Sequence, residues 1–542
     1  MTSPCSLLQG FGARSFLPLL MVVACLAPAS RSQVFPISLQ PPVKLISLAS
    51  SAGDQYGGAV ATGADVIAIG APFANGARGE VIIEEFNGTS FSETVTLAPL
   101  ALPSGAQFGL ELALDGDTLA VGAPEPTFPA TGAGSVYVYL RNGSTWALQA
   151  TLTPSAGQAG DQFGRGLALQ DDRLIVGSPF DDDGGIQAGS AWVFERSGGL
   201  WAETAQLLAT DASSGAQFGK SVALDNDTAL VGAWLDSSAL SQAGAGYVFV
   251  EAGGLWSEQA KLAAGAAAMG DNAGTCVGLE GDMAVLGAPL ANSAAGAIFQ
   301  FGRDPLLGVW TELPFTPPFS ITAGDVFGTS LAFEEGSLLV GSPEENSQGT
   351  ALGTVLFFVL DGQGVFQLDT EFDGSGAVGD RFGQSVSIGA GLLGIGVPFG
   401  NGGTFGSGAV MAVEKLTQGI WTSLGKSLDG THGTPLFVGT GDLIEGSPFS
   451  LDLANSLENS LAALFIGFSE VCAPFHLGVL SPSPDFVIIV TTDGLGEQQF
   501  AGDWPTGHGG PFPVYLQWWV QDAGALAGWS ASNAIEALTP PG

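Results

Sequence analysis

The sequence FGRGLALQDDRLIVGSP, residues 163–179, is one copy of the pattern that decides the fold. It begins with an aromatic residue followed by Gly164, and thirteen residues later Gly177 begins a Gly-small-Pro triplet. The same thirteen-residue step separates the two glycines in all seven copies along the chain, and successive copies are 52 to 55 residues apart. Chance does not produce seven such registers, so we expect seven structural repeats.

Both motifs survive with few substitutions. The aromatic-Gly pairs are Tyr56-Gly57, Phe108-Gly109, Phe163-Gly164, Phe218-Gly219, Phe327-Gly328 and Phe382-Gly383, with Ala273-Gly274 in the fifth copy. The triplets are Gly70-Ala71-Pro72, Gly122-Ala123-Pro124, Gly177-Ser178-Pro179, Gly287-Ala288-Pro289, Gly341-Ser342-Pro343 and Gly396-Val397-Pro398, with Gly232-Ala233-Trp234 in the fourth copy. We expect the aromatic ring to fill the space between repeats and the glycines to mark close backbone approach.

Each repeat contains four strand-like segments. In the second copy, Asp115-Gly116 supplies a tight turn, and the next strand ends at its triplet because Pro cannot donate to a strand ladder. Residues 135–139 predict a third strand, and a fourth begins with an aromatic residue, Trp146. Four antiparallel strands in each of seven repeats predict an all-β, seven-bladed β-propeller.

One question about ring closure stays open. Residues 43–48 and residues 421–428 both resemble the outer strand that would join the first blade to the last. Only one of them is needed, and the sequence does not decide between them.

The two motifs together resemble the FG-GAP repeat, known from the head of integrin α subunits and from many secreted bacterial proteins. The resemblance covers residues 43–430 and implies a propeller that acts in extracellular recognition. Many FG-GAP repeats hold calcium in a longer loop between the motifs. The thirteen-residue step leaves room for two strands and a tight turn only, so we expect no cofactor. The best remaining cation candidate is Asp181-Asp182-Asp183.

Charge and the N-terminal segment indicate where the protein works. The 542 residues carry a net charge of −38, which repels nucleic acids and anionic lipids, so we expect neither as partner. Residues 1–31 are typical of a signal peptide, and no later segment is long and apolar enough for a transmembrane span. We therefore expect a secreted or cell-surface protein. A lipoprotein-like box ending at Cys25 leaves a lipid anchor as an alternative.

Residues 433–542 predict a small C-terminal β-sandwich-like module, because apolar runs alternate with Pro and Gly turns. The module resembles a terminal domain of various secreted bacterial proteins through residues 517–522 and 528–534. Its tryptophans could stack on sugar rings, although core packing is the simpler expectation; they are Trp504, Trp518, Trp519 and Trp529. Four residues of the module are of types that bind metals, but they lack the spacing of a metal site: Asp485, Asp503, His476 and His508.

Catalysis is not expected. All three histidines lie outside the seven repeats, so no blade holds a His-based triad or a His metal cluster. The acidic pairs of the repeats lie at hairpin turns, where exposure to water does not create a general acid. The two cysteines beyond the signal segment, Cys276 and Cys472, predict no disulfide framework.

We expect instead a non-enzymatic binding or adhesion protein that recognises an extracellular protein or polysaccharide through loops on one propeller face. The loops after the Gly-small-Pro triplet vary most, at residues 125–134, 180–189, 235–246 and 344–353. Candidate binding residues on them are Glu125, Asp181, Asp182, Asp183, Asp236, Glu344 and Glu345. The alternatives are a structural envelope or surface protein anchored by the C-terminal module, and a propeller-based polysaccharide lyase or hydrolase. The sequence leaves the oligomeric state open.

Overall fold

The computed structural model consists of two compact units. The first contains residues 39–360 and 365–415, and the second contains Ser38 and the described residues from Leu416 onward. The described residues are 38–47, 50–99, 101–125, 132–304, 307–315, 317, 321–344, 352–360, 365–374, 377–400, 406–416, 421–425, 436–440, 448–454, 457, 460–467, 470–475, 478–482, 486–493, 498–503, 513–521, 529–531 and 534–538. The expected signal peptide, residues 1–31, and Cys25 within it lie outside this set.

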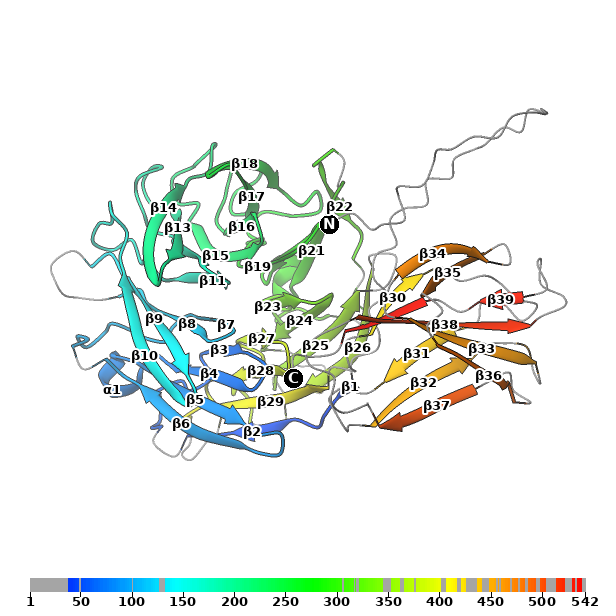
Figure 1. The fold of residues 1–542 in the computed structure, drawn as a ribbon. Helices are drawn as coiled ribbons and strands as arrows, with labels where there is room; N and C mark the ends of the chain where they lie inside the picture. The colour runs from blue at the N-terminus through cyan, green and yellow to red at the C-terminus, as the bar shows by residue number, and fades with distance from the viewer. Residues whose placement is uncertain are drawn as a thin grey trace, which may run out of the picture. The chain divides into compact units, whose positions relative to one another are not determined.

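The first unit is the expected seven-bladed β-propeller. Six of its blades are sheets of four consecutive antiparallel strands, labelled from β3 to β26 in Figure 1. These strands are β3 (Ala59–Thr62), β4 (Val66–Ala71), β5 (Glu80–Phe86) and β6 (Phe91–Leu97) in blade 1; β7 (Leu112–Asp115), β8 (Thr118–Ala123), β9 (Ser135–Asn142) and β10 (Thr145–Leu152) in blade 2; β11 (Gly166–Gln170), β12 (Arg173–Ser178), β13 (Ser190–Ser197) and β14 (Leu200–Leu207) in blade 3; β15 (Phe218–Asp225), β16 (Thr228–Ala233), β17 (Ala245–Ala252) and β18 (Leu255–Leu262) in blade 4; β19 (Cys276–Glu280), β20 (Met283–Ala288), β21 (Ala297–Arg303) and β22 (Trp310–Leu313) in blade 5; and β23 (Ser330–Glu334), β24 (Ser337–Ser342), β25 (Thr354–Leu360) and β26 (Phe366–Asp373) in blade 6.

Blade 7 is completed by a strand from the other end of the propeller sequence. Its strands β27 (Val386–Ile388), β28 (Leu392–Val397) and β29 (Ala409–Leu416) are joined by β2 (Val43–Leu45), which pairs antiparallel with β29. The short β1 (Ser38–Leu39) pairs with the same strand. The rival segment, β30 (Trp421–Gly425), pairs with β40 (Ala534–Leu538) of the second unit. Strand pairing therefore assigns ring closure to β2 and places residues 421–425 outside the propeller.

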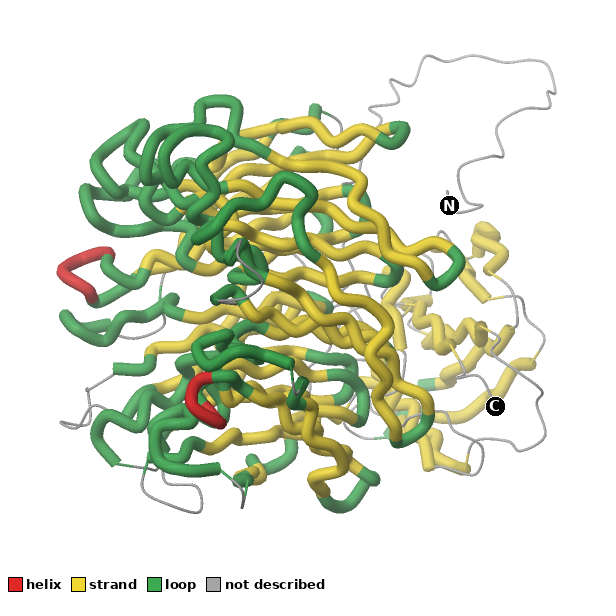
Figure 2. Tube along the Cα trace, turned by 90° about the vertical axis from the view of Figure 1, so that its left-hand side faces the viewer, coloured by secondary structure: helices red, strands yellow, loops and turns green. Residues whose placement is uncertain are grey.

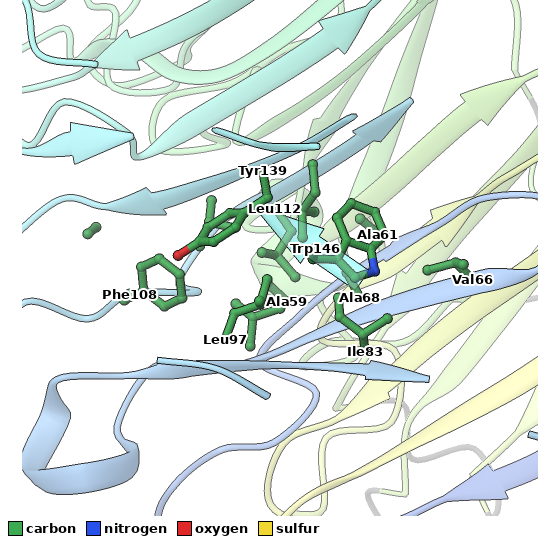
Figure 3. Close-up of a cluster of buried hydrophobic side chains, with 14 of the residues drawn as sticks. Ala59, Ala61, Val66, Ala68, Ile83, Leu97, Phe108, Leu112, Tyr139 and Trp146 are labelled. Carbon is green, nitrogen blue, oxygen red and sulfur yellow. The ribbon is translucent and has the colours of Figure 1, made fainter. Parts of the chain in front are cut away.

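The core of the propeller lies between neighbouring blades. The second strand of a blade is buried along its whole length, as in β4, β8 and β16, because a sheet packs against each of its faces. Between blades 1 and 2, Phe108 and Tyr139 pack with apolar side chains of blade 1 that include Ile83 and Leu97 (Figure 3). The ring of Phe108 is fully buried and meets Tyr137 edge-on, with 5.4 Å between ring centroids.

The two motif glycines mark the closest approach of neighbouring blades. A Cβ built on the first glycine of each Gly-small-Pro triplet would lie 1.9–2.4 Å from the carbonyl oxygen of the aromatic-motif glycine in the next blade. The seventh of these contacts runs from Gly396 to Gly57 and so closes the ring. Each aromatic-motif glycine has a φ between 85° and 97°, a region that residues with a Cβ rarely adopt. Both positions therefore require glycine.

A hydrogen bond between the two motif glycines of a blade accounts for the thirteen-residue step. The Gly109 N–H donates to the Gly122 carbonyl over 3.0 Å, and the Gly164 N–H donates to the Gly177 carbonyl over 3.1 Å. The bond closes the end of the hairpin formed by the first two strands. An insertion between the motifs would therefore have to bulge out at the turn of that hairpin.

The second unit is also built from strands, in line with the expected β-sandwich-like module. One sheet has the order β30-β40-β38-β33-β36, with β39 on β38; a second has the order β31-β32-β37; and β34 pairs with β35. Their bounds are β31 (Leu436–Thr440), β32 (Pro448–Ala454), β33 (Leu461–Gly467), β34 (Glu470–Phe475), β35 (Gly478–Pro482), β36 (Phe486–Thr491), β37 (Gln498–Asp503), β38 (Pro513–Gln521) and β39 (Trp529–Ala531). Trp518 and Trp519 of β38 are fully buried, so these two rings pack inside the unit.

The two ends of the propeller differ. The long loops after the Gly-small-Pro triplets and the loops that lead into each aromatic motif lie at one end, which we call the loop end. The short turns α1 (Ala74–Ala77) and α2 (Ala291–Ala294) lie there too. The hairpin turns between first and second strands and between third and fourth strands lie at the opposite end, the turn end. Figure 2 shows the long loops and both helical turns gathered at one end of the strands.

Candidate functional site

The loops of the loop end are tied to one another across the blade boundaries. In five of the seven blades, the loop after the triplet accepts a backbone hydrogen bond from a glycine of the loop that leads into the next blade. The pairs are Gly160 N–H to Gly132 O, Gly215 N–H to Ile186 O, Gly270 N–H to Ser241 O, Gly324 N–H to Ala294 O and Gly53 N–H to Gly406 O, at 2.8–3.0 Å. These bonds hold the loop end as a connected surface, although its sequence varies from blade to blade.

Two of the predicted binding residues are buried inside their loops. Asp181 is 2% exposed, and its carboxylate accepts hydrogen bonds from the Asp183 N–H and the Ser190 hydroxyl. Asp236 is also 2% exposed and accepts hydrogen bonds from the hydroxyl groups of Ser238 and Tyr247. Both carboxylates stabilise the conformation of their own loops, because they accept hydrogen bonds from donors within the same chain.

The other predicted acids also have partners within the chain. Asp182 accepts from the Gln187 N–H, and Asp183 accepts from the Gln206 side chain. Glu125 accepts from Gln162, and Glu344 accepts from Arg381 at 2.9 Å. Glu345 lies outside the described residues. The structure thus distributes these acids over separate loops and does not bring them together into one site.

The same contacts bear on the cation candidate. The three carboxylates of Asp181, Asp182 and Asp183 are each engaged by donors of their own blade, so they do not converge on a common point. Within the described part of the chain, no group of three or more His, Cys, Asp or Glu side chains is arranged to hold a metal ion. His476, His508, Asp485 and Trp504 lie outside the described residues, and the side chains of Asp503 and Trp529 are not described.

Apolar side chains are exposed on neighbouring loops of the loop end. Ile186 in blade 3 is 72% exposed and Leu240 in blade 4 is 48% exposed. Met269, in the loop that leads into blade 5, is 72% exposed. The Gly270–Ser241 hydrogen bond joins the two loops at the residues that follow Met269 and Leu240. Sequence reasoning concentrated on the acids of these loops and missed these apolar residues.

At the turn end, the acidic pairs have a structural use beyond solubility. The Arg141 guanidinium forms ion pairs with Asp65 and Glu85 of the preceding blade, at 2.8 and 3.0 Å. Arg173 pairs with Asp227 of the following blade at 3.0 Å. Asp65 and Asp227 therefore connect neighbouring blades through arginine, whereas Asp172 and Asp282 pair with an arginine of their own blade.

A cavity of about 510 Å³ runs along the axis of the ring. It is lined by the first strand of every blade and by the residue that follows each aromatic-motif glycine. At the loop end these following residues are Gly58, Leu110, Arg165, Lys220, Thr275, Thr329 and Gln384. Two neighbouring blades thus place a cation at the same level of the channel, and Glu111 of blade 2 lies beside them.

Burial changes the acidity of the groups at this level. It raises the pKa of Glu111 to about 7, although the charges of Lys220 and Arg165 act to lower it. Burial also lowers the pKa of Lys220, and the nearby Arg165 charge adds to that effect. Cys276, in the channel wall, donates its thiol proton to the Gly328 carbonyl, and burial raises its pKa to about 12. Burial therefore disfavours the thiolate form in which a cysteine acts as a nucleophile.

Glu334 lines the turn end of the channel, and carboxylates at the ends of other first strands near that end fasten the blades together. Asp225 accepts the Gly281 N–H over 2.6 Å, and Glu280 accepts the Gly336 N–H over 2.8 Å, each from the turn of the following blade. Asp115 accepts the Asp171 N–H in the same way. The axis of the propeller consequently runs from a cationic end to an anionic end.

Comparison with known families supports the reading of the repeat. The model for the FG-GAP repeat matches residues 91–139, 146–194, 201–249 and 256–301. Each match begins in the fourth strand of one blade and ends in the third strand of the next, so the sequence unit straddles a blade boundary. No curated protein matches the chain. In the described part of the chain, no helix is long and apolar enough to cross a membrane.

Proposed function

Because the first unit is an FG-GAP β-propeller, a fold that fits binding and adhesion, we propose that this protein recognises an extracellular protein or polysaccharide through its loop end. FG-GAP propellers are generally non-enzymatic, and their repeats are typical of extracellular proteins. The observation that carries the proposal is the group of exposed apolar side chains on loops whose backbones are bonded to one another.

Two properties make this end suitable for a partner. Loops that are already held by hydrogen bonds lose little freedom on binding, so less of the interaction energy is lost to ordering. Met269 and Ile186 each present a large apolar side chain to water, and Met is enriched at protein interfaces. The acids of these loops, Asp181–Asp183 and Asp236, already have hydrogen-bond partners within the chain, so we expect apolar contact to contribute most of the affinity.

The site of action follows from the N-terminal segment. We propose that residues 1–31 direct export and are removed, which releases the protein to the cell surface or the medium. Attachment of a lipid at Cys25 is the alternative. Fractionation of expressing cells, with mass spectrometry of the mature N-terminus, distinguishes the two, because a lipid on Cys25 adds a defined mass and retains the protein in membranes.

The binding proposal is tested by screening the full-length mature chain against purified extracellular proteins and polysaccharides. For a partner found in this way, Ile186→Asp and Met269→Asp should each weaken binding by tenfold or more, as expected for buried interface anchors. Leu200→Asp and Leu255→Asp are matched controls, because these leucines are 77% and 75% exposed but lie at the turn end. Binding that is lost in the controls and kept in the loop-end variants would reject the proposal.

A further inference from the structure

The two cations in the channel stand apart from most others in the propeller. Seven Lys and Arg side chains form ion pairs within 4 Å: Arg141, Arg173, Arg196, Lys261, Arg303, Arg381 and Lys415. Arg165 and Lys220 form no ion pair and no side-chain hydrogen bond with any described residue. This is notable in a chain with 52 acidic and only 14 basic side chains.

Their surroundings make the lack of a partner costly. Arg165 and Lys220 come from neighbouring blades and lie half-buried at the same level of the channel, so their charges repel each other. Glu111 lies near enough to interact with both charges but bonds directly to neither. The level therefore carries two cations and one carboxylate, and the donors of both cations remain available.

We propose that the loop end of the channel binds a carboxylate group of a small ligand, held by Arg165 and Lys220. A guanidinium presents two parallel N–H donors that match the two oxygens of a carboxylate, and an ammonium adds a charge-assisted hydrogen bond. The cavity of about 510 Å³ is of the size that accommodates small ligands. This inference goes beyond recognition by the loops and does not depend on it.

The neighbouring groups favour a monoanion that also carries hydroxyl groups. Above pH 7, where Glu111 is ionised, its charge offsets one of the two cations, so a singly charged group matches the remaining charge better than sulfate or phosphate would. Thr275 and Thr329 donate their hydroxyl protons to the Asn272 and Val326 carbonyls, each over 2.7 Å. Their oxygens are left as acceptors, which suit the hydroxyl donors of a sugar acid.

The direction of entry follows from the charges along the axis. An anion that enters from the loop end meets Arg165 and Lys220 first, whereas the turn end presents Glu334, with Glu280 and Asp115 near enough for their charges to act on it. The carboxylates of the turn end repel anions, and those bonded to the turns of the following blade cannot swing away. A carboxylate ligand should therefore reside at the cationic level only.

The first experiment is calorimetric titration of the full-length chain with glucuronate, acetate, glucose and sulfate. Glucuronate and acetate should bind with millimolar or better affinity, glucuronate the more tightly, and glucose should not bind. Sulfate that binds as tightly as glucuronate would overturn the assignment to a carboxylate. The absence of saturable binding by either carboxylate would overturn the site altogether.

Variants then locate the site. Arg165→Gln and Lys220→Gln should each weaken glucuronate binding by about tenfold, because each removes a charge-assisted hydrogen bond. Arg78→Gln is the charge-matched control, since Arg78 is exposed on a loop outside the channel, and it should leave the affinity unchanged. A loss of affinity in Arg78→Gln equal to that in Arg165→Gln would show a general charge effect and reject the site.

A third variant should increase the affinity for glucuronate while both cations stay in place. Glu111→Gln keeps the shape of the side chain and removes the competing charge, so glucuronate should bind about threefold more tightly or better. The variant also guards against misfolding of Arg165→Gln, because a gain of affinity requires a folded channel. Unchanged or weaker binding in Glu111→Gln would contradict the charge arrangement proposed here.

Discussion

Replacement of Gly177 by Ala should separate blades 3 and 4. The φ of Gly177 lies outside the left-handed region, so Ala fits the local backbone and any loss of stability comes from its new Cβ. That Cβ would lie 1.9 Å from the Gly219 carbonyl oxygen and 2.8 Å from the Gly219 carbonyl carbon. Real Cβ atoms essentially never come closer than 3.0 Å, so the blades must part by about 1 Å.

The cost of this movement can be set from the packing it disturbs. The clash joins the new Cβ, which is fixed to the backbone of β12, and the Gly219 carbonyl oxygen, which belongs to the backbone of β15. No side-chain rotation therefore relieves it. Phe218, 1% exposed at the same boundary, would lose part of its packing as the blades part. Overpacking of a core costs 1–3 kcal/mol when side chains can adjust, so we expect about 3 kcal/mol or more here.

The control is Gly143→Ala. Gly143 has a φ of 63°, and a Cβ added to it would meet no atom within 4 Å, so only the backbone preference is lost. That preference is worth about 1–2 kcal/mol. Urea unfolding, monitored by tryptophan fluorescence, measures both changes in the free energy of unfolding. The comparison uses variants whose free energy of unfolding has the same slope against urea concentration. A smaller loss of stability in Gly177→Ala than in Gly143→Ala would refute the reasoning from blade contact.

Three further predictions concern stability and metal. Tyr56→Phe should stabilise the fold by about 1 kcal/mol in the same urea assay, because the Tyr56 hydroxyl is buried and has no hydrogen-bond partner among the described residues; a loss of stability would mean that the hydroxyl is used. The free energy of unfolding should fall as pH rises from about 4.5 to 7 and stay level above that. Glu84 alone, which is 5% exposed, should account for up to about 3 kcal/mol of this fall. Burial, with the nearby charge of Glu93, raises the pKa of Glu84 to about 7, so the folded chain binds a proton that the unfolded chain has released; Glu84→Gln should flatten that part of a pH–stability profile. EDTA should leave the melting temperature unchanged, and a drop of several degrees that calcium restores would show that a cation supports the fold.

The blade pattern could be predicted because it is local. Turn residues, alternating strands and the two glycines lie within one repeat, and the bond from the Gly109 N–H to the Gly122 carbonyl joins two positions of the same hairpin. Ring closure could not be predicted in this way. Residues 43–48 and 421–428 carry the same local pattern, and the choice between them rests on a pairing between distant parts of the chain, Val43 with Ala412.

The functional surface was less accessible from the sequence. Asp181 and Asp236 look like exposed loop acids, and only the folded loop shows that each is buried against donors of its own blade. The channel cations did leave a signal. When the seven repeats are aligned, the position after the aromatic-motif glycine is charged in two of them only, at Arg165 and Lys220, and these two repeats are consecutive.

Closure of blade 7 by β2 also bears on how the protein assembles. Leu45 pairs with Val410, and 365 residues separate them, so β2 is synthesised long before its partner exists. Contacts of such sequence separation form late and slowly. Until they form, the outer edge of β29 presents unpaired backbone groups, and the β2 strand of a second molecule fits that edge as well as the chain's own. Refolding at high concentration should therefore favour dimers that have exchanged β2, whereas refolding at high dilution should favour closed monomeric rings.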